Sequence, residues 1–555
     1  MRQHIQSKHV PIIWGLLFAV LASLFAIYFV GQEKFIYFWD YSNYWQKTQE
    51  IAKGLIQNPL WQVLKVFISI RKDDYNELAA WPLLPFYFIF GASRLVYILS
   101  LVNIWMVPAA LSFLWVSLAK KPWSLFFLVF FSPFFWDPAL NGYVDVGGVI
   151  FIHLALVLFW KFPWNQIRTR KELFTLAVIL SAAPLFRRWY SYWTESFFIL
   201  SFLMAVWHAW KTSDKTQKYI YLKNWGWTFL YTGIFFTLVS FPLPLKILKT
   251  NYAYAYASSK TSQNFSEFLS INFFNYFGLF HVITFFAGIL VCFLSGKETR
   301  EKALFIFAQF LLIIYFFARV QDFGAHHYYM LLPAMILAQH VLYQRLPAIL
   351  KGLFAAGYLF CFLIVLMPSM EAVHQAAPLL TPERKHYPRM RTDLVEIKRL
   401  RDVLLAQGAD PGSPVYMIAS SKKFNSDTIK VAERSMGLEE KLSPAILWTY
   451  NIDRSEGLPK KFFSAKYVVL IEPTQYHVKP KYQQVIGLLA DAFIHDEQIA
   501  ASYEKLPEVF HFDEGATGTI FKKTKDVPEE AADRLKARFL QSYPDWEKME
   551  FTPKG

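Results

Sequence analysis

Runs of about twenty apolar residues recur along this chain, and they constrain its fold more than any other feature. The first run extends from Pro11 to Val30 and reads PIIWGLLFAVLASLFAIYFV. A helix of this length can cross a hydrocarbon core about 30 Å thick. Because no small-x-small cleavage site clearly follows it, we interpret the run as a retained membrane helix and not as a signal peptide.

The apolar runs and the breaks between them predict eleven membrane spans. The composition agrees, because only 18% of the residues are charged, whereas about a quarter are charged in soluble domains. We therefore expect an α-helical polytopic membrane domain. The predicted spans cover residues 11–30, 94–118, 122–136, 146–160, 172–186, 195–210, 225–245, 273–295, 303–318, 328–343 and 350–367.

Lysine and arginine residues predict the orientation of these spans. With the N-terminus inside, the cytoplasmic pieces hold 17 of these residues and the four short external loops hold 6. Membrane proteins keep an excess of Lys and Arg on the cytoplasmic side, which supports this orientation. We interpret the formal charge of +15 in the same way, because the sequence has no visible nucleic-acid-binding motif. An odd number of spans then places the loop 31–93 and everything from Pro368 outside the cytoplasm, on an inner (plasma) membrane.

The sequence predicts two domains, a transmembrane domain over residues 1–367 and an extracytoplasmic domain over residues 368–555. In the second domain, PVYMIAS, AKYVVLIEP and GTIFKKT are expected to form strands. DLVEIKRLRDVLLAQ, YQQVIGLLADAF and the end of KKTKDVPEEAADRLKARF are expected to form helices. This alternation predicts an α/β layer. No Gly-rich phosphate loop is present, so we do not predict a nucleotide-binding domain.

Asp40 is the first candidate site residue. It lies in FIYFWDYSNYWQ, a few residues after the first apolar run, among rings that include Tyr41, Tyr44 and Trp45. A carboxylate partly removed from water has a raised pKa and is a better base, and aromatic faces suit sugar rings. An aromatic belt at the membrane interface would explain the rings about as well, but it explains Asp40 poorly.

The same external loop contains a second acidic point, in RKDDYNELAAWPLLP. Asp73, Asp74 and Asn76 are the polar residues of this stretch, and we take them as candidate substrate-binding residues.

Arginine residues at the external ends of spans are candidate phosphate ligands. Arg187 and Arg188 are adjacent in LFRRWYSYW, and Arg319 stands in a similar place in ARVQDFGAHHYY. Their position runs against the cytoplasmic preference of basic residues. Adjacent guanidinium groups can bind a phosphate through paired donors. The alternative is that these side chains only extend to the lipid headgroups.

The loop around Arg319 also contains Asp322, His326 and His327. Two histidines with an acid could bind a divalent metal ion, but no third spaced ligand is evident. A role in binding phosphate or sugar is therefore favoured over a metal site. In NYAYAYASSK, Tyr252 belongs to an alternating Tyr and Ala segment that could be a lid over a site or an ordinary interfacial loop.

Together these features resemble the GT-C superfamily of membrane glycosyltransferases, in particular the bacterial aminoarabinose transferases and protein mannosyltransferases. The resemblance is carried by the first span with its external acid and by the loop ending DYNELAAWPLLPFYFIFGASRLVYILSL. Many further spans and an external α/β tail complete it. The resemblance covers about residues 1–367 and implies that Asp40 is the catalytic base. It also implies juxtamembrane helices at roughly Tyr41–Gln57 and Pro59–Ile70.

The expected function is transfer of a sugar from a polyprenyl-phosphate-linked donor to a lipid, glycan or protein acceptor on the extracytoplasmic face. Asp40 would deprotonate the acceptor, and direct attack with one base implies inversion at the anomeric carbon. Three alternatives remain: a flippase or transporter of lipid-linked saccharides, a polymerase of lipid-linked glycan repeats, and a scaffold without enzymatic activity whose C-terminal domain is the working part. A transporter would need polar groups near the bilayer midplane and on both faces.

Overall fold

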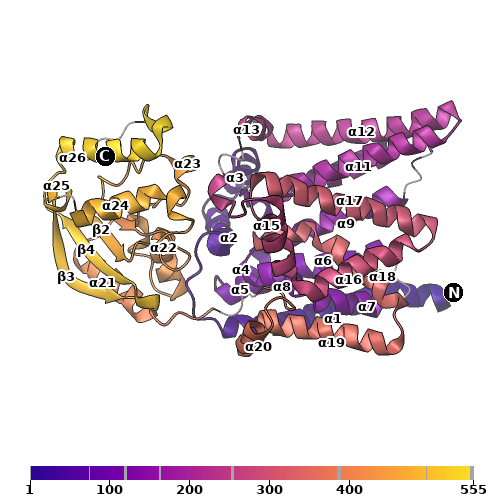
Figure 1. The fold of residues 1–555 in the computed structure, drawn as a ribbon, viewed down its shortest axis with the longest axis horizontal. Helices are drawn as coiled ribbons and strands as arrows, with labels where there is room; N and C mark the ends of the chain where they lie inside the picture. Colours follow the sequence, from indigo (N-terminus) through magenta and orange to yellow (C-terminus); the bar gives the residue numbers. More distant parts are fainter. Residues whose placement is uncertain are drawn as a thin grey trace. The chain divides into compact units, whose positions relative to one another are not determined.

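The protein consists of two compact units (Figure 1). The computed structural model describes residues 2–73, 75–117, 122–161, 164, 166–251, 256–383, 389–495 and 497–549. The first unit comprises Met1–Glu33, Asp40–Thr250 and Ser262–Pro388, and the second comprises Lys34–Trp39, Asn251–Thr261 and Arg389–Gly555. Grouped by contacts between residues, the first unit extends to Pro388, beyond the domain boundary that the sequence predicts at residue 368. That domain boundary stays a prediction.

The first unit is built from helices, as the apolar runs predict. Each of the eleven predicted spans overlaps helix in the structure. Figure 1 shows these helices in indigo to orange, many of them running roughly alongside one another. The α-helices that overlap the predicted spans are α1 (Arg2–Gly31), α5 (Arg94–Leu101), α6 (Val107–Ser117), α7 (Pro122–Phe130), α8 (Pro133–Leu140), α9 (Gly148–Lys161), α10 (Arg170–Phe186), α11 (Tyr190–Lys211), α12 (Lys215–Ser240), α13 (Leu243–Lys249), α16 (Tyr276–Phe293), α17 (Lys297–Val320), α18 (Leu332–Arg345) and α19 (Ala348–Leu366).

The predicted count of eleven spans is not confirmed. Within the described ranges, six helical stretches are long and apolar enough to cross a membrane, and two bent helix pairs raise this number to eight. The bent pairs are α7 with α8, at 47°, and α12 with α13, at 104°. The other three predicted spans form α10, α11 and α18. Of these, α10 and α18 are short, and α11 carries polar residues such as Glu195 and His208. The chain is a multi-pass membrane protein.

Two amphipathic helices follow the first span, where the resemblance implied them. They are α2 (Asp40–Gln57) and α3 (Pro59–Lys72). Asn58 separates the two helices, because its side chain accepts a hydrogen bond from the Trp61 backbone N–H and caps α3. The following segment forms two short 3-10 helices, η1 (Glu77–Ala79) and η2 (Trp81–Leu83), before α4 (Leu84–Phe90). This loop is therefore ordered by its own caps and turns.

The second unit contains a four-stranded mixed sheet with the strand order β1-β2-β4-β3. The strands β1 (Val415–Ile418) and β2 (Tyr467–Glu472) are parallel. The strand β4 (Thr517–Lys523) is antiparallel to β2 and also to β3 (Tyr503–His511). Strand β3 thus forms one edge of the sheet.

Helices cover the sheet of the second unit. Alternate residues of β1 and β2, such as Ile418 and Val468, join one buried cluster with α24 (Gln484–His495) and α26 (Glu529–Ser542). Figure 1 shows these two helices beside the orange and yellow strands. The helix α21 (Leu394–Ala406) packs against β3 and against α22 (Ser426–Ser435). The unit is thus an α/β layer structure, as predicted.

Strand β3 was not predicted, and its sequence explains why. The segment YEKLPEVFH contains a proline and three charged residues in its first six positions. An edge strand tolerates such residues, since one side of its backbone has no strand to pair with. The pairing is also irregular between Lys505 and Val509. The helix α22 (Ser426–Ser435) was not predicted either.

Candidate active site

Segments far apart in the sequence meet around the carboxyl group of Asp40. Asp40 is the first residue of α2, and Tyr75 follows α3. Asp145 lies in the short 3-10 helix η4 (Val144–Gly147), which leads into α9, and Arg187 ends α10. All four residues belong to the first unit. Each lies at or near the end of a helix, so its place depends on how the helices pack and not on the local sequence.

A buried ion pair between Arg187 and Asp145 forms the centre of the cluster. Each of the two side chains is 2% exposed. Nε of Arg187 donates to Oδ1 of Asp145 over 2.9 Å, and Nη1 donates to the Tyr44 hydroxyl over 2.9 Å. The Tyr190 hydroxyl donates to the Asp145 carbonyl over 2.6 Å. Within the described residues, Oδ2 of Asp145 is buried without a hydrogen-bond partner. The pair therefore holds a guanidinium and a carboxylate in fixed positions.

Two tyrosine rings enclose the guanidinium of Arg187. Its Cζ atom lies 4.6 Å from the ring centre of Tyr75 and 5.2 Å from that of Tyr44. Such contacts stabilise a cation that has been removed from water. Burial raises the pKa of Tyr44 to about 12, so its hydroxyl keeps its proton at neutral pH.

Asp40 is partly buried and interacts with the same groups. Burial raises the pKa of its carboxyl group above the usual range for an aspartate, and the negative charge of Asp145 acts in the same direction. The Arg187 guanidinium and a hydrogen bond with the Tyr75 side chain lower this pKa. The net shift is upward, which makes Asp40 a stronger base than an aspartate in water.

Tyr41 belongs to a second aromatic contact next to this cluster. Its ring meets that of Tyr143 with centres 5.7 Å apart, and Tyr143 stacks on His326 at 4.5 Å. Arg94 donates to the Tyr41 carbonyl over 2.6 Å. Gly142 has φ of 94°, and a Cβ atom there would lie 2.7 Å from that carbonyl. Only glycine fits this backbone approach.

Two of the candidate substrate-binding residues, Asp73 and Asn76, line a pocket together with Arg188. Ten residues line this pocket, among them Asp73, Asn76 and Arg188. Asp73 is paired with Lys47 at 3.0 Å, and the Asn76 amide donates to the Leu185 carbonyl over 2.8 Å. Asp74 lies outside the described residues.

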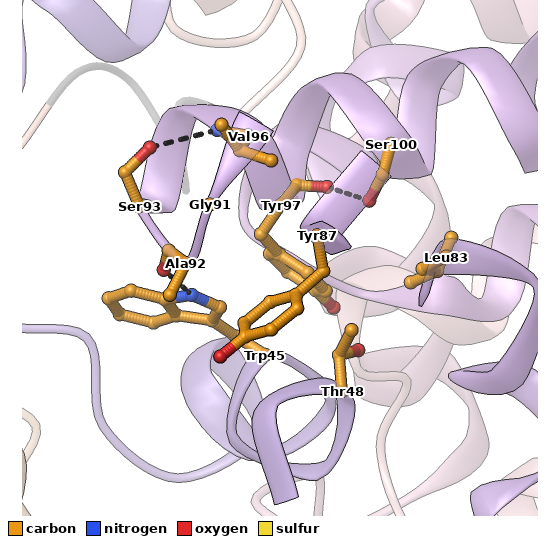
Figure 2. Close-up of a pocket in the computed structure, with 10 residues that line it drawn as sticks. All are labelled: Trp45, Thr48, Leu83, Tyr87, Gly91, Ala92, Ser93, Val96, Tyr97 and Ser100. Atoms are coloured by element: carbon orange, nitrogen blue, oxygen red, sulfur yellow. Dashed lines mark hydrogen bonds between the residues drawn. The ribbon is translucent and has the colours of Figure 1, made fainter. Parts of the chain in front are cut away.

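Trp45 forms the wall of a small pocket between α2, α4 and α5 (Figure 2). Its indole N–H donates to the Ala92 carbonyl over 2.9 Å, and the Tyr87 ring lies beside it. The indole therefore ties the start of α5 to α2, a structural role that the sequence did not predict.

The other predicted residues are placed in different surroundings. Asp322 accepts hydrogen bonds from the Ser262 hydroxyl at 2.9 Å and from the Asn272 amide at 3.0 Å, so it links the loop after α17 to a second loop and to the π-helix η6 (Ser270–Asn275). Arg319 is exposed and lies over the Tyr315 ring. Tyr252 lies outside the described residues.

His327 is buried next to Trp189, with ring centres 4.6 Å apart. Its Nδ1 accepts the backbone N–H of Gly324 over 2.9 Å. Burial lowers the pKa of His327 well below the usual range, and the charges of Arg187 and Arg188 act in the same direction. Nowhere in the described ranges do three or more His, Cys, Asp or Glu side chains gather as a metal site requires.

The sequence analysis did not select Asp145 or Tyr75. Asp145 had a usable signal, because GYVDVGG places a lone acid just before a predicted span, as FIYFWDY places Asp40 just after one. Tyr75 stands beside the acids of the second acidic point, but a lone tyrosine in an aromatic-rich chain is not distinctive.

The fold was compared with known structures. A crystal structure of ArnT from Cupriavidus metallidurans bound to undecaprenyl phosphate has a TM-score of 0.53 with this chain, at 12% sequence identity. The match covers 92% of this chain and 98% of the ArnT chain. The apo structure of the same ArnT has a TM-score of 0.50 at 11% identity, and it covers 91% and 97% of the two chains.

At the level of sequence, no protein-family model matches this chain, and no curated protein matches it either. Because the match covers 92% of this chain, it includes at least part of the C-terminal unit. The chain therefore has a fold similar to that of ArnT, in agreement with the resemblance to the aminoarabinose transferases.

Proposed function

We propose that this protein transfers a sugar from a polyprenyl-phosphate-linked donor to an acceptor hydroxyl or amine, with Asp40 as the base. The observation that carries the proposal is the cluster of Asp40, Asp145 and Arg187. It combines a carboxyl group of raised pKa with a fixed cation at the ends of several helices. Chemistry at such a place suits a donor whose lipid lies in the membrane and whose sugar lies at its surface.

In this reaction Asp40 removes the proton from the acceptor atom, which then attacks the anomeric carbon of the donor sugar. The bond from that carbon to the phosphate oxygen breaks as the new bond forms. The electron pair leaves with the polyprenyl phosphate, whose charge requires nearby cations. Attack on the face opposite the leaving group inverts the anomeric carbon. The sugar transferred in this proposal is a hexose or a pentose.

The contacts favour Arg188 over Arg187 as the phosphate ligand. Arg187 already donates to Asp145 and Tyr44, and its side chain is 2% exposed. Arg188 is only partly buried and lines the pocket that Asp73 and Asn76 share. Arg187 instead supplies a fixed positive charge that adjusts the pKa of Asp40.

The ArnT structure supports a lipid donor, since that protein is bound to undecaprenyl phosphate. We extend this ligand class to the present chain, together with an inner-membrane location and an extracytoplasmic site. A saccharide flippase with this fold would need no base, so the raised pKa of Asp40 favours a transferase. A polymerase of lipid-linked repeats would use the same groups and differs only in its acceptor.

The proposal is tested with Asp40→Asn in the full-length protein. The change keeps the size of the side chain and removes its basicity, so turnover should fall by about a hundredfold or more. The assay supplies undecaprenyl-phosphate-linked sugars of several kinds to membranes and measures release of undecaprenyl phosphate. Binding of undecaprenyl phosphate should stay near the wild-type value.

Glu50→Gln is the matched control, because it removes one carboxylate from the exposed side of the same helix. It should keep full turnover. Normal turnover by Asp40→Asn would exclude Asp40 as the base.

A further inference from the structure

Arg94 lies outside the cluster of Asp40, Asp145 and Arg187, but it contacts both segments that carry the two carboxylates. It is the first residue of α5 and is 8% exposed. Its side chain reaches the first turn of α2, which begins at Asp40, and the loop from α8 to η4, in which Asp145 lies. Arg94 and both of these segments belong to the first unit.

Arg94 holds α2 at its N-terminal end. Its Nη1 donates to the Tyr41 carbonyl over 2.6 Å, and Tyr41 directly follows Asp40 in the chain. Its Cζ atom lies 5.8 Å from the ring centre of Trp45, one turn further along α2. The Trp45 indole N–H in turn donates to the Ala92 carbonyl over 2.9 Å. The beginning of α2 is thus attached to the beginning of α5.

The same face of α5 also holds the loop before Asp145. Tyr97 lies one turn after Arg94, and its hydroxyl donates to the Gly142 carbonyl over 2.7 Å. The Cζ atom of Arg94 lies 5.5 Å from the ring centre of Tyr97. A Cβ atom at Gly142 would lie 2.8 Å from Nη1 of Arg94, so the loop backbone passes directly beside the guanidinium. The two side chains therefore fix Gly142, and with it Asp145 three residues later, relative to α2.

Helix stability does not explain a cation at this place. Arg94 stands in the first turn of α5, and the carbonyl that it binds belongs to the first turn of α2. The N-terminal end of a helix carries a partial positive charge, so a cation is disfavoured there. Burying a guanidinium also costs free energy that burying an apolar side chain does not. What arginine supplies is a planar fork of donors that packs against aromatic rings in a fixed orientation.

We propose that Arg94 is a positioning residue for the transfer reaction and sets the position of Asp40 relative to Asp145. It acts through the backbone of Tyr41 on one side and through the backbone of Gly142 on the other. This inference rests on the proposed role of Asp40 as the base.

The position of α2 matters because the groups that act on Asp40 come from other elements. They are Arg187 at the end of α10, Asp145 in η4 and Tyr75 after α3. When Arg94 is removed, α2 can move away from these groups, and the Asp40 carboxyl becomes more accessible to water. Its pKa, which burial raises in the wild type, should then fall towards the usual value of an aspartate.

The test compares three variants of the full-length protein with one control. Arg94→Ala removes the donor and the ring contacts, whereas Arg94→Lys keeps a donor but not the planar fork. Tyr97→Phe keeps the ring and removes only the hydroxyl that binds Gly142. Arg168→Ala is the matched control, because Arg168 also lies at the N-terminal end of a helix, with its side chain 11% exposed and paired with Glu172 at 3.2 Å.

The first measurement separates turnover from binding. The kcat for release of undecaprenyl phosphate should fall about tenfold or more in Arg94→Ala, since small misplacements of a reacting group are costly. Arg94→Lys should restore part of this kcat, and Tyr97→Phe should lose less, about twofold to tenfold, because one hydrogen bond is removed. Binding of undecaprenyl phosphate should change less than about twofold in each variant.

The second measurement is the pH dependence of kcat. Asp40 acts as a base only when it is deprotonated, so kcat declines as the pH falls through its pKa. In Arg94→Ala this decline should move to lower pH, whereas in Arg168→Ala it should stay where the wild type has it. A side chain that only stabilised the fold would leave the position of this decline unchanged.

The inference is overturned if Arg94→Ala turns over like wild type, if its pH profile does not move, or if Arg168→Ala loses as much activity. It is also overturned if Arg94→Lys is no more active than Arg94→Ala, or if the loss of kcat is matched by an equal loss of undecaprenyl phosphate binding. If Arg94→Ala does not fold, wild-type kcat in both Arg94→Lys and Tyr97→Phe overturns it.

The positioning role and the proposed base are distinguished by Asp40→Asn. Full loss of turnover in Asp40→Asn combined with normal Arg94→Ala would reject only the positioning role. Normal turnover in Asp40→Asn would reject the base itself, whatever the Arg94 variants show.

Discussion

At the scale of single residues, the buried Arg187–Asp145 pair has consequences for stability. Removing one partner of such a pair leaves the other charge uncompensated, which costs about 3–5 kcal/mol. Arg187→Ala should therefore lower the thermal stability of the detergent-purified protein strongly. Arg319→Ala is the control, because Arg319 is exposed and should contribute less than about 0.5 kcal/mol. Equal melting temperatures for the two variants would contradict the prediction.

Arg188 should contribute more to binding of undecaprenyl phosphate than to the stability of the fold. A hydrogen bond to a charged group contributes about 1.5–3 kcal/mol, so Arg188→Ala should weaken binding of undecaprenyl phosphate by about tenfold or more. Titration calorimetry in detergent measures this. Arg319→Ala should bind as wild type does. If Arg319→Ala weakens binding and Arg188→Ala does not, the phosphate is bound at the other loop.

Candidate site residues could be predicted from the sequence where a charged residue stands in a place that usually lacks such a charge. Asp40 is an acid among aromatic rings, and Arg187 is a cation at a predicted external boundary. Both belong to the cluster. The partner of Arg187 could not be predicted, because Asp145 lies 42 positions away and is reached only when η4 packs against the end of α10.

At the scale of secondary-structure elements, Asp453 joins three parts of the second unit. It begins α23 (Asp453–Glu456), and its Oδ2 accepts the Val485 N–H at the start of α24 over 2.9 Å. The Tyr543 hydroxyl, just past α26, donates to the same oxygen over 2.7 Å. Burial raises the pKa of Asp453 to about 6, although these hydrogen bonds lower it.

This raised pKa gives the stability of the second unit a pH dependence of known sign. The folded carboxyl binds its proton more tightly than the unfolded one, whose pKa is 3.8. The protonated Asp453 carboxyl therefore stabilises the folded unit fully below about pH 4, and this stabilisation is lost as the pH rises through about 6. Asp453→Asn keeps an acceptor without the charge, so it should stabilise the unit at pH 8 by about 1–3 kcal/mol and hardly at all near pH 4.

Hydrogen exchange of the β2 amides in the full-length protein, corrected for the intrinsic effect of pH, measures this difference. Asp410→Asn is the control, because Asp410 is exposed. The prediction is that Asp453→Asn slows the exchange relative to wild type at pH 8 and hardly changes it at pH 4. If the variant instead slows the exchange at pH 4 and not at pH 8, the predicted sign of the pH dependence is wrong.

Elements with a clear periodicity were predictable, and elements that depend on their neighbours were not. The helices α21 and α24 and the strands β1 and β2 have apolar faces or runs that match their structure. Strand β3 has no such pattern, because it lies at the edge of the sheet, where charged residues and a proline are tolerated. The bend between α12 and α13 was missed in the run predicted as one span over 225–245, although Pro242 and Pro244 stand at this bend.

At the scale of the whole molecule, the predicted orientation can be tested directly. The distribution of Lys and Arg places the part from Pro368 onward outside the cytoplasm. Protease added to spheroplasts should therefore cut this part and release fragments of it. Inverted membrane vesicles, in which the cytoplasmic side faces the protease, are the control and should protect it. The opposite pattern would mean that the number of spans is even.

The sequence by itself determined the class of this protein. Apolar length, charge distribution and strand and helix periodicity are local properties, and they were enough to predict a multi-pass helical part and an α/β part. The GT-C-like architecture was implied by the resemblance to that superfamily, and the likeness to ArnT agrees with it. Apolar length, charge distribution and periodicity are predictive because each depends on whether a segment faces water or lipid. They depend little on which other segments pack against it.

Only the tertiary structure decided which side chains act together. It brought Asp40, Tyr75, Asp145 and Arg187 into one cluster, and it left Arg319 over a tyrosine ring elsewhere. It also assigned Trp39 and Asp40, neighbours in sequence, to different units. The physical reason is that burial and pairing of charges depend on contacts between helix ends that are distant in the chain, and no local pattern encodes those contacts.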